Sequence, residues 1–353
     1  AVNSGVSKLK ILYGVQGTGN GHITRARVML PALQAAGCEV DFLLSGRPKE
    51  AYFDMEMFGD YKAFKGFSFH SQQGSVNWLK TIAEASPIDY LSDLKGLQVK
   101  DYDLVLTDFE PLSAWAAKLQ GVPSLGLAHQ YALCYPIPGT KGSPLLPKAL
   151  KSFAPAKHYL GVHWASYDAP IIPPLISMDH KQESSEEDFI LVYLPFEDIA
   201  DIVPWLQKIP QQQFIVYRKA KDTIQDKNIL LKPLSRESFP KDLSACSGVI
   251  CNTGFGLCSE AMVLGKKIYT KALAKQVEQF SNGKILEDLN RAVVFKKLKT
   301  RPLLEWLEQP NPVRAIFPPV AEEVAAWIVK QDYSDTKSLV DSLWAKSENI
   351  KAK

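Results

Sequence analysis

The chain has 353 residues, of which 46% are hydrophobic and 22% charged, and its formal net charge is +3. This length suffices for two domains of ordinary size, and the apolar content suffices for a core in each. Because the small positive balance is scattered along the chain, it excludes a nucleic-acid binder that relies on bulk charge. The apolar runs all fall short of the ~20 residues that cross a bilayer.

The five cysteines form no CxxC pair and no spacing typical of a zinc site. An odd, unpatterned set is typical of a reducing compartment, where thiols pack as small apolar groups. The first ten residues lack the apolar stretch of a secretory signal. We therefore expect a cytoplasmic protein, and peripheral contact with the inner face of a membrane stays open.

The first part of the chain alternates apolar strands with amphipathic helices. The patterns predict strands at Leu9–Val15, Glu39–Leu44, Asp103–Thr107 and Pro123–Ala128, with a short one around Phe64, Phe67 and Phe69. They predict helices at His22–Ala36, kinked at Pro31, at Leu112–Gln120, ended by Gly121, and within Trp78–Ser86 and Ile88–Gly96. Strands separated by helices favour a parallel, doubly wound sheet.

A proline-rich passage at Pro170–Pro174, followed by the polar run Asp179–Asp188, interrupts this alternation. We place a domain boundary there, with an N-terminal domain at 1–170 and a C-terminal domain at 171–353. Further strands are predicted at Phe189–Leu194, Phe214–Arg218, Ile229–Pro233, Gly248–Cys251, Lys267–Thr270 and Ala292–Phe295. Helices are predicted at Pro204–Lys208, Phe255–Leu264, Phe280–Leu289, Val320–Val329 and Thr336–Lys346.

A glycine-rich turn, Gly17–His22, connects the first strand to the first helix. Its glycines let backbone approach a ligand, and unpaired N–H groups at the helix start face outward. The glycines alternate, so the spacing differs from a dinucleotide fingerprint, and Asp41 lies too early in the second strand for its acidic residue. The alternative is a ligand-free glycine turn.

His22 opens the first predicted helix, and Asp108 follows the strand Asp103–Thr107. The carboxyl ends of strands in an open α/β sheet meet at one edge, so Asp108 is expected to orient His22 and stabilise its protonated form. A helix N-terminus also favours the neutral imidazole, which accepts protons. In the alternative interpretation, His22 packs or caps a helix and Asp108 caps the helix that follows it.

A second strand–turn–helix segment runs through Asn252-Thr253-Gly254. Gly254 and Gly256 permit close approach to a pyrophosphate at the helix start. Glu260 lies seven residues after Thr253, on the same side of the helix, where its carboxylate would accept hydrogen bonds from ribose hydroxyls. Alternatively, Glu260 is a solvated helix residue and the glycines form an ordinary turn.

Together the two segments resemble the GT-B glycosyltransferases, and among these the UDP-glycosyltransferase and MurG-like group. Gly21-His22 matches the family's N-terminal Gly-His, and Asp108, before the helix that contains Trp115, matches its supporting Asp. Asn252-Thr253-Gly254 with Ser259-Glu260 matches its C-terminal pattern, although Asn252 replaces the usual His or Arg. Glu278-Gln279, shortly before Asn282-Gly283, matches the Asp-Gln or Gln-Gln pair that precedes Asn-Ala and touches the donor sugar, with Glu in place of Asp and Gly in place of Ala. Leu234 with Phe239 resembles the wall around the base.

The resemblance implies a GT-B fold: two Rossmann-like, doubly wound parallel-sheet domains that face each other across a cleft, with C-terminal helices packing back on the N-domain. It implies an inverting, metal-independent glycosyltransferase that needs no cofactor, uses a nucleoside-diphosphate sugar, with UDP as the expected nucleotide, and acts on a hydroxyl acceptor. His22 would be the general base and Asp108 its support. The donor-binding residues would be Gly19, Gly21, Leu234, Phe239, Asn252, Thr253, Gly254, Gly256, Ser259, Glu260, Glu278 and Gln279.

Two alternatives remain open on the same fold: a nucleotide-sugar epimerase or hydrolase, and a non-catalytic nucleotide-sugar sensor. Asp101-Tyr-Asp103 mimics the DxD metal motif, but its place before a buried strand favours a solvated start of that strand. His129, His158 and His163 lack zinc spacing and are interpreted as structural or acceptor-side residues. Trp164 and Tyr167 are expected to pack at the hinge, and Phe53, Phe58, Phe64 and Phe67 in the core.

Overall fold

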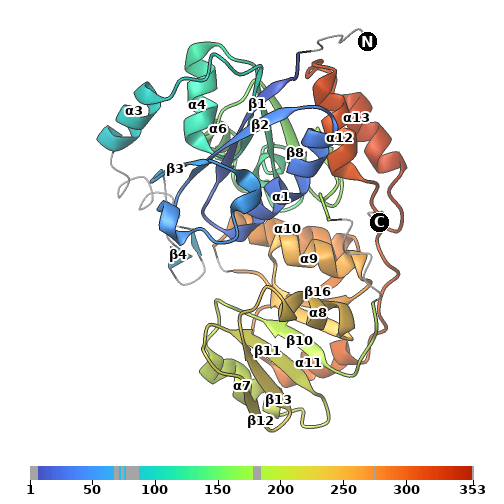
Figure 1. The fold of residues 1–353 in the computed structure, drawn as a ribbon. Coiled ribbons are helices and arrows are strands. Elements are labelled where there is room, and N and C mark those ends of the chain that lie inside the picture. The colour runs from blue at the N-terminus through green and yellow to red at the C-terminus, as the bar shows by residue number, and fades with distance from the viewer. Residues whose placement is uncertain are drawn as a thin grey trace, which may run out of the picture. The chain divides into compact units, whose positions relative to one another are not determined.

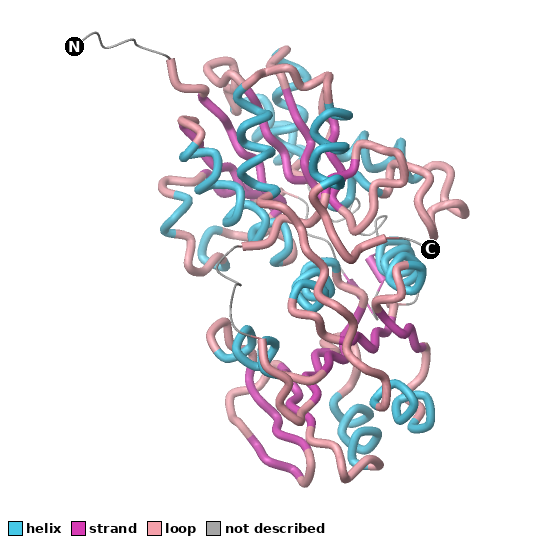
Figure 2. Tube along the Cα trace, turned by 90° about the vertical axis from the view of Figure 1, so that its right-hand side faces the viewer, coloured by secondary structure: helices cyan, strands magenta, loops and turns pink. Residues whose placement is uncertain are grey.

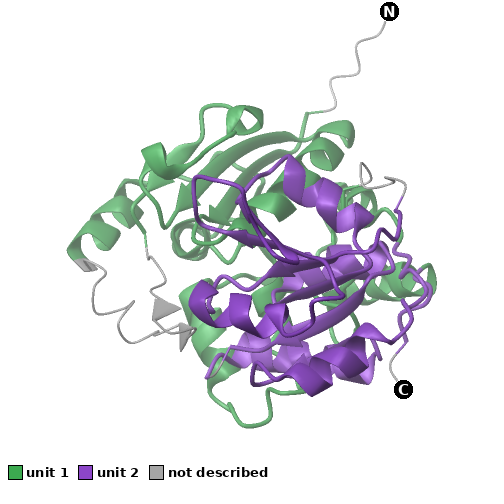
Figure 3. Cartoon of the chain, turned by 90° about the horizontal axis from the view of Figure 1, so that it is seen from below, with its two compact units in different colours: residues 1–72, 76–177, 318–346 green, residues 73–75, 178–317, 347–353 purple. Residues whose placement is uncertain are grey.

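The computed structural model describes residues 7–66, 71–72, 75–76, 87–177, 184–273 and 275–351 (Figure 1). The chain splits into two compact units, coloured separately in Figure 3. Unit 1 comprises residues 1–72, 76–177 and 318–346, and unit 2 comprises residues 73–75, 178–317 and 347–353. The expected strand residues Phe67 and Phe69 and the expected helical segment Trp78–Ser86 lie outside the described residues.

Unit 1 is built on a parallel sheet, which has seven strands in the described part of the chain, in the order β3-β2-β1-β6-β7-β8-β9. The strands are β1 Lys10–Gln16, β2 Glu39–Ser45, β3 Lys62–Phe64, β6 Leu104–Asp108, β7 Ser124–Ala128, β8 His158–Val162 and β9 Ile171–Ile172. A separate short ladder pairs β4 Ser71–Gln72 with β5 Ser75–Val76. Strand β1 lies between β2 and β6, so the strand order reverses there, which is the usual ligand site of such sheets.

The helices of unit 1 flank this sheet (Figure 2). They are α1 Asn20–Ala35, α3 Pro87–Gly96, α4 Pro111–Gln120, α5 His129–Ala132, α6 Leu146–Phe153, α12 Val320–Val329 and α13 Thr336–Ala345, with 3₁₀ turns at Lys49–Ala51 and Glu56–Phe58. Helix α1 begins two residues earlier than expected and continues through Pro31. Gly121 ends α4 with φ 69°, in the left-handed conformation that glycine adopts readily, as expected for a helix C-cap.

The two C-terminal helices complete unit 1. Helix α12 packs on α1, and its buried residues include Val324 and Ile328. Helix α13 packs on β9, where the Trp344 indole donates a hydrogen bond of 2.8 Å to the Ile171 carbonyl. The sequence boundary at 170/171 grouped residues 320–346 with the C-terminal part of the chain. By their contacts these residues belong to unit 1, which otherwise ends at Ser177.

Unit 2 repeats the architecture with the order β12-β13-β11-β10-β14-β15-β16, in which the hairpin β12–β13 is antiparallel and the other pairs are parallel. Its strands are β10 Ile190–Tyr193, β11 Phe214–Arg218, β12 Ile224–Asp226, β13 Ile229–Pro233, β14 Gly248–Asn252, β15 Lys267–Lys271 and β16 Ala292–Phe295. Its helices are α7 Ile199–Gln207, α8 Ser238–Ala245, α9 Phe255–Val263, α10 Val277–Asp288 and α11 Thr300–Leu307. The strand order reverses at β10, between β11 and β14.

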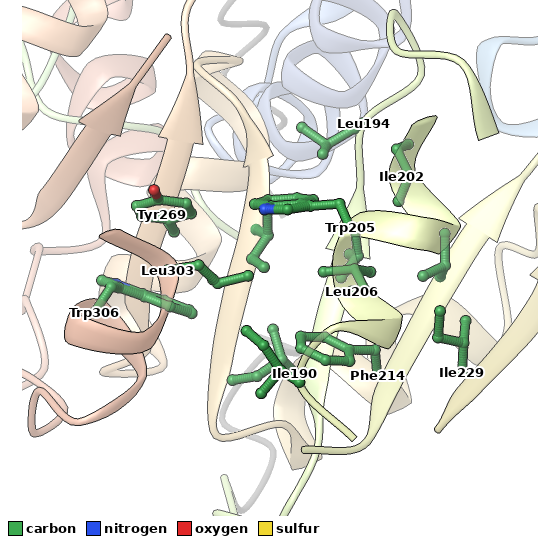
Figure 4. Packing of buried hydrophobic residues seen from close by; sticks show 14 of the residues in the cluster. Ile190, Leu194, Ile202, Trp205, Leu206, Phe214, Ile229, Tyr269, Leu303 and Trp306 are labelled. Carbon is green, nitrogen blue, oxygen red and sulfur yellow. The ribbon is translucent and has the colours of Figure 1, made fainter. Parts of the chain in front are cut away.

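An aromatic group anchors the core of unit 2 (Figure 4). Tyr269 stacks on Phe295 with 4.1 Å between ring centroids, and Trp205 and Trp306 pack against the same tyrosine. These rings come from α7, β15, β16 and α11, so they join one end of the sheet to the helices on that face. Large aromatic side chains contribute more buried area per residue than any others, and this group therefore fixes how α7 and α11 sit on the strands.

Among the described residues, no helix is both long and apolar enough to cross a bilayer.

Candidate active site

The glycine-rich turn of unit 1 places His22 at the start of α1. Gly19 is the N-cap with φ 89°, a conformation that side-chain-bearing residues rarely adopt. A Cβ at Gly19 or Gly21 would meet no atom within 4 Å, so both glycines border open space. A Cβ at Gly17 would instead lie 2.0 Å from the Tyr52 hydroxyl, so this glycine permits close packing of the turn.

His22 and Asp108 form a buried hydrogen-bonded pair at the carboxyl edge of adjacent strands. Nδ1 of His22 lies 2.6 Å from Oδ1 of Asp108. Asp108 ends β6, pairs in register with Val15 of β1 and is 0% exposed, whereas His22 is 8% exposed. The structure thus brings together the two residues expected to form the catalytic pair, at the point where the strand order of unit 1 reverses.

The carboxylate of Asp108 also binds Arg25, which the sequence analysis did not select. Nη1 of Arg25 donates to both carboxylate oxygens, at 2.9 Å and 3.1 Å, from one turn further along α1. Arg25 could have been selected from the sequence, because it lies three residues after His22 and residues three apart share one face of a helix. A fully buried carboxylate needs such a counterion to offset its lost hydration.

The hydrogen bonds define the chemistry available at His22. An ionised carboxylate only accepts hydrogen bonds, so Nδ1 of the neutral imidazole carries the proton and Nε2 is left with a lone pair. The amide nitrogen of Gln130 lies 3.4 Å from Nε2, where it can donate. Tyr13 and Tyr131 are fully buried nearby, and burial is the main cause that raises the pKa of both phenols. The charge of Asp108 adds to the shift of each, after Tyr159 in the case of Tyr131. The arrangement suits Nε2 to accept a proton.

Glu110, rather than Asp108, caps the helix that follows β6. The Glu110 carboxylate accepts hydrogen bonds from the N–H groups of Leu112 and Ser113, at 2.8 Å and 2.7 Å, and from the Ser45 hydroxyl. The capping role offered as the alternative for Asp108 is therefore wrong. Glu110 is itself fully buried, and this burial raises its pKa although the hydrogen bonds from Ser113, Ser45 and Leu112 oppose the shift.

The second loop, in unit 2, joins β14 to α9. Gly254 is the N-cap of α9 with no side-chain cap, and the first turn of α9 contains no acidic residue. A Cβ at Gly254 or Gly256 would meet no atom within 4 Å, so both glycines again border open space. The Asn252 side chain donates to the Lys271 carbonyl at 3.0 Å and so binds its own sheet.

Two of the expected donor-binding side chains are engaged inside unit 2. The Thr253 hydroxyl is buried 3.0 Å from both the Gln279 carbonyl oxygen and its side-chain oxygen. That side-chain oxygen also accepts from the Leu273 N–H, and the Asn282 amide donates to the Thr253 carbonyl. These bonds tie α10 to the β14–α9 loop, so Gln279 and Thr253 hold the loop in shape through their side chains.

The remaining expected donor-binding residues lie on the surrounding elements of unit 2. Glu260 and Ser259 lie on α9, and the Ser259 hydroxyl donates back to the Phe255 carbonyl at 2.6 Å. Glu278 is in the first turn of α10. Leu234 is 51% exposed just after β13, and Phe239 packs edge-on against Tyr217 and Tyr193.

The family model described as Glycosyl transferase family 1 matches residues 9–309. The chain belongs to glycosyl transferase family 1. It is therefore a glycosyltransferase. No curated protein matches its sequence significantly.

Solved structures of other glycosyltransferases share its fold. SnogD from Streptomyces nogalater matches with a TM-score of 0.55 and 15% identity over 96% of this chain and 99% of that one. MurG of Acinetobacter baumannii matches at 0.53 and 14%, over 96% and 100%. UGT89C1 of Arabidopsis thaliana, solved with UDP, matches at 0.56 and 13%, over 96% and 100%. The likeness extends over both units and confirms the expected GT-B fold.

The DxD-like pair of this glycosyltransferase lies at the amino edge of the unit 1 sheet. Asp103 precedes β6, and its carboxylate accepts a hydrogen bond of 2.8 Å from the Lys10 N–H at the start of β1. Asp108 lies at the opposite end of β6. Asp101 and Asp103 are therefore exposed residues just before β6, as expected for a solvated strand start.

Other side chains weighed from the sequence fall into structural positions. His129 lies 2.8 Å from the Val162 carbonyl, and Nδ1 of His163 accepts from the Trp164 N–H at 2.8 Å. His163 and Trp164 are fully buried, and His158 lies on β8 near the ring of Tyr333. The expectation of a core position was wrong for Phe53, which is 75% exposed, and correct for Phe58.

Proposed function

We propose that this glycosyltransferase moves a sugar from a nucleoside-diphosphate donor to a hydroxyl acceptor with His22 as the general base. The observation that carries the proposal is the His22–Asp108 hydrogen bond at the strand-order reversal of unit 1. When Nδ1 donates to Asp108, the Nε2 lone pair of the neutral imidazole lies at the helix start that follows the glycine turn. A hydroxyl placed there has a proton acceptor within the same site.

The chemical step follows from that geometry. Nε2 of His22 takes the acceptor proton, and the acceptor oxygen forms a bond to the anomeric carbon as the bond to the diphosphate oxygen breaks. The transition state carries oxocarbenium character. Asp108 stabilises the imidazolium, with Arg25 holding its carboxylate in place. An attack opposite the leaving group inverts the anomeric configuration.

The donor side is assigned to unit 2. UGT89C1 was solved with UDP, and the glycosyltransferase VinC, which matches this chain with a TM-score of 0.56 and 14% identity, was solved with dTDP. The proposed donor therefore carries one of these two diphosphates. The diphosphate would bind the N–H groups at the start of α9, beside Gly254 and Gly256, because helix N-termini favour anions. We propose that the same N–H groups stabilise the leaving charge without a metal ion.

Individual side chains would complete the donor site. The carboxylate of Glu260 accepts hydrogen bonds from the ribose hydroxyls, and Leu234 with Phe239 borders the base. Glu278, at the start of α10, contacts the sugar. Gln279 and Thr253 act indirectly, because their side chains hold the β14–α9 loop. The acceptor would bind unit 1 beside His22, and a cytoplasmic location remains our prediction.

A two-part assay tests this function. Thermal shift with UDP- and dTDP-sugars identifies the donor, since a ligand well above its Kd raises the melting temperature. Diphosphate release is then measured with and without a panel of hydroxyl acceptors. The proposal predicts release that depends on an acceptor and a product of inverted anomeric configuration. Equal release without acceptor would identify an epimerase or hydrolase, and binding without release would identify a sensor.

A further inference from the structure

A partly buried ion pair spans the carboxyl edge of the unit 2 sheet at the strand-order reversal. Nζ of Lys271, the last residue of β15, contacts Oε1 of Glu197 in the β10–α7 connection. Their side chains are only 21% and 17% exposed. Strand β14 lies between β10 and β15 in the sheet, so the pair passes over the end of β14 at Asn252.

That position is directly before the proposed diphosphate loop. Asn252 pairs in register with Lys271, and its amide donates to the Lys271 carbonyl. Asn252 occupies the position at which the UDP-glycosyltransferase and MurG-like group usually carries a His or Arg. This chain therefore has no cationic side chain at the end of β14. Lys271, at the end of the neighbouring strand β15, places a positive charge at the same carboxyl edge of the sheet.

Two helix starts at this edge, those of α9 and α7, differ in whether they can accept an outside anion. The first turn of α9 has no acidic residue and no side-chain cap, and Gly254 and Gly256 border open space. By contrast, α7 is capped by its own Asp198, whose carboxylate accepts from the Ala200 N–H at 2.9 Å. Of these two helix starts, that of α9 is therefore the one available to an outside anion, and it follows Asn252, the register partner of Lys271.

We propose that Lys271 is a diphosphate-binding residue and that Glu197 is the internal counterion which the donor displaces. An unpaired lysine ammonium at the surface would be flexible and strongly hydrated. The ion pair with Glu197 instead holds the Lys271 ammonium in one position, with only part of its side chain exposed to water. An incoming diphosphate carries more charge than a carboxylate and also binds the α9 N–H groups, so Lys271 exchanges one anionic partner for another. This inference rests on the proposed function, because it assigns a residue of the same donor site.

Paired substitutions test it. The dissociation constants of UDP and dTDP, and of uridine and thymidine, are measured by calorimetry on the full-length protein. Lys271→Gln is expected to weaken diphosphate binding about ten- to a hundredfold, the usual range for a lost charged hydrogen bond, and to change nucleoside binding less than twofold. Glu197→Gln removes the competing anion and is expected to leave diphosphate binding equal or tighter.

Lys267→Gln is the matched control. Lys267 lies on the same strand but at its other end, where its ammonium donates to the Leu307 and Gln309 carbonyls. Lys267→Gln removes the same positive charge from unit 2 as Lys271→Gln and is expected to leave every dissociation constant unchanged. If the ion pair were only structural, Lys271→Gln and Glu197→Gln would weaken nucleoside and diphosphate binding alike, and that result would overturn the inference.

The same data separate this inference from the proposed function. Wild-type protein that binds neither UDP nor dTDP would contradict both. Tight diphosphate binding by the wild type, unchanged in Lys271→Gln, would contradict the role of Lys271 and leave the donor assignment standing.

Discussion

At the scale of single residues, the site in unit 1 depends on how a buried carboxylate is held. Asp108 has no exposure to water, so its charge must be balanced within the protein. Arg25 supplies the positive charge and His22 a hydrogen bond, and both come from the first two turns of α1. We interpret Arg25 as a positioning residue, which acts on the base through Asp108.

Replacing Arg25 separates positioning from folding. Arg25→Gln leaves Asp108 buried without a cation, so we expect the free energy of unfolding to fall by about 3–5 kcal/mol. In the folded fraction, kcat is expected to fall about tenfold or more while the KM for donor stays within about twofold, because the base is misaligned and unit 2 is untouched.

Arg25→Lys provides the control. It keeps the charge but not the planar guanidinium, so we expect intermediate stability and a partial return of kcat. Steady-state kinetics and urea unfolding measure both quantities. If Arg25→Gln lost stability but kept the wild-type kcat, the positioning role would be contradicted.

The sequence could predict the His22–Asp108 pair because both residues follow the carboxyl ends of strands that the α/β alternation makes neighbours. It could not assign Gln279 correctly. A family match suggests contact with the sugar, but only the fold reveals that its side-chain oxygen binds Thr253 and Leu273. Arg25 was accessible in principle from its helical spacing relative to His22.

At the scale of elements, the start of α9 can be tested through Gly256, which lies in its first turn. A Cβ there meets no atom within 4 Å, and alanine is about 1 kcal/mol more favourable than glycine inside a helix. Gly256→Ala should therefore raise the unfolding free energy slightly. The added methyl group would occupy space beside the proposed diphosphate, so we expect UDP or dTDP binding to weaken about tenfold, or 1.4 kcal/mol.

Gly96→Ala at the end of α3 is the matched substitution in unit 1, since a Cβ there also meets nothing within 4 Å. It should leave nucleotide binding unchanged. Calorimetric titration of the two variants with UDP or dTDP measures the dissociation constants to be compared. Gly256→Ala with wild-type affinity for the diphosphate would show that α9 does not receive it.

Helix α4 provides a prediction on pH dependence. Burial raises the pKa of Glu110 in the folded protein above its unfolded value of about 4.3. The folded state therefore binds the proton more tightly, and the stability from this group is fully present below pH ~4.3 and declines as pH rises toward the raised folded pKa. Glu110→Gln replaces the titratable carboxyl group with an amide, so the free energy of unfolding of this variant should lack the decline with pH that Glu110 causes in the wild type.

The measurement is urea unfolding of wild type and Glu110→Gln at several pH values from 4 upward. The variant also places an amide NH₂ group among the N–H donors of Leu112 and Ser113, so it should be less stable at every pH. The wild-type advantage should shrink as pH rises. An advantage that grows with pH would contradict the direction of the Glu110 shift.

Element types were more predictable than their boundaries. Short apolar runs identified β10, β11, β13 and β16, because strands in the interior of a domain carry mostly apolar residues over four to five positions. Helix α7 extends well before the segment Pro204–Lys208 that was predicted to lie in it. It begins at Ile199 because Asp198 caps it, and Pro204 is accommodated inside it. The amphipathic helix α6 and strand β8 lie in a stretch whose glycines and prolines hid the pattern.

At the scale of the whole molecule, the last two helices, α12 and α13, belong to the same unit as the first strand and helix. Residues 318–346 pack on α1 and β9, so the helix that carries His22 is supported by the C-terminal part of the sequence. Amphipathic patterns located these helices almost to the residue. Which sheet they cover depends on long-range packing that local patterns do not encode.

Ile328→Ala tests that dependence. Ile328 is fully buried on α12, and removing a buried aliphatic side chain to alanine costs about 2–5 kcal/mol. Because α12 packs on α1, we expect scanning calorimetry to show a lower melting temperature for unit 1. A saturating diphosphate should still stabilise unit 2 by the same amount as in wild type. A loss confined to unit 2 would contradict the assignment of α12 to unit 1.

The most direct test of the account is the comparison of transfer and donor binding in His22→Ala. A general base contributes about 10²–10⁴-fold to the rate, and His22 lies in unit 1, whereas the donor is assigned to unit 2. We therefore predict that sugar transfer falls by at least about a hundredfold while the dissociation constant of the diphosphate stays within about twofold. Transfer at the wild-type rate, or an equal loss of transfer and diphosphate binding, would contradict the role of His22 as the base.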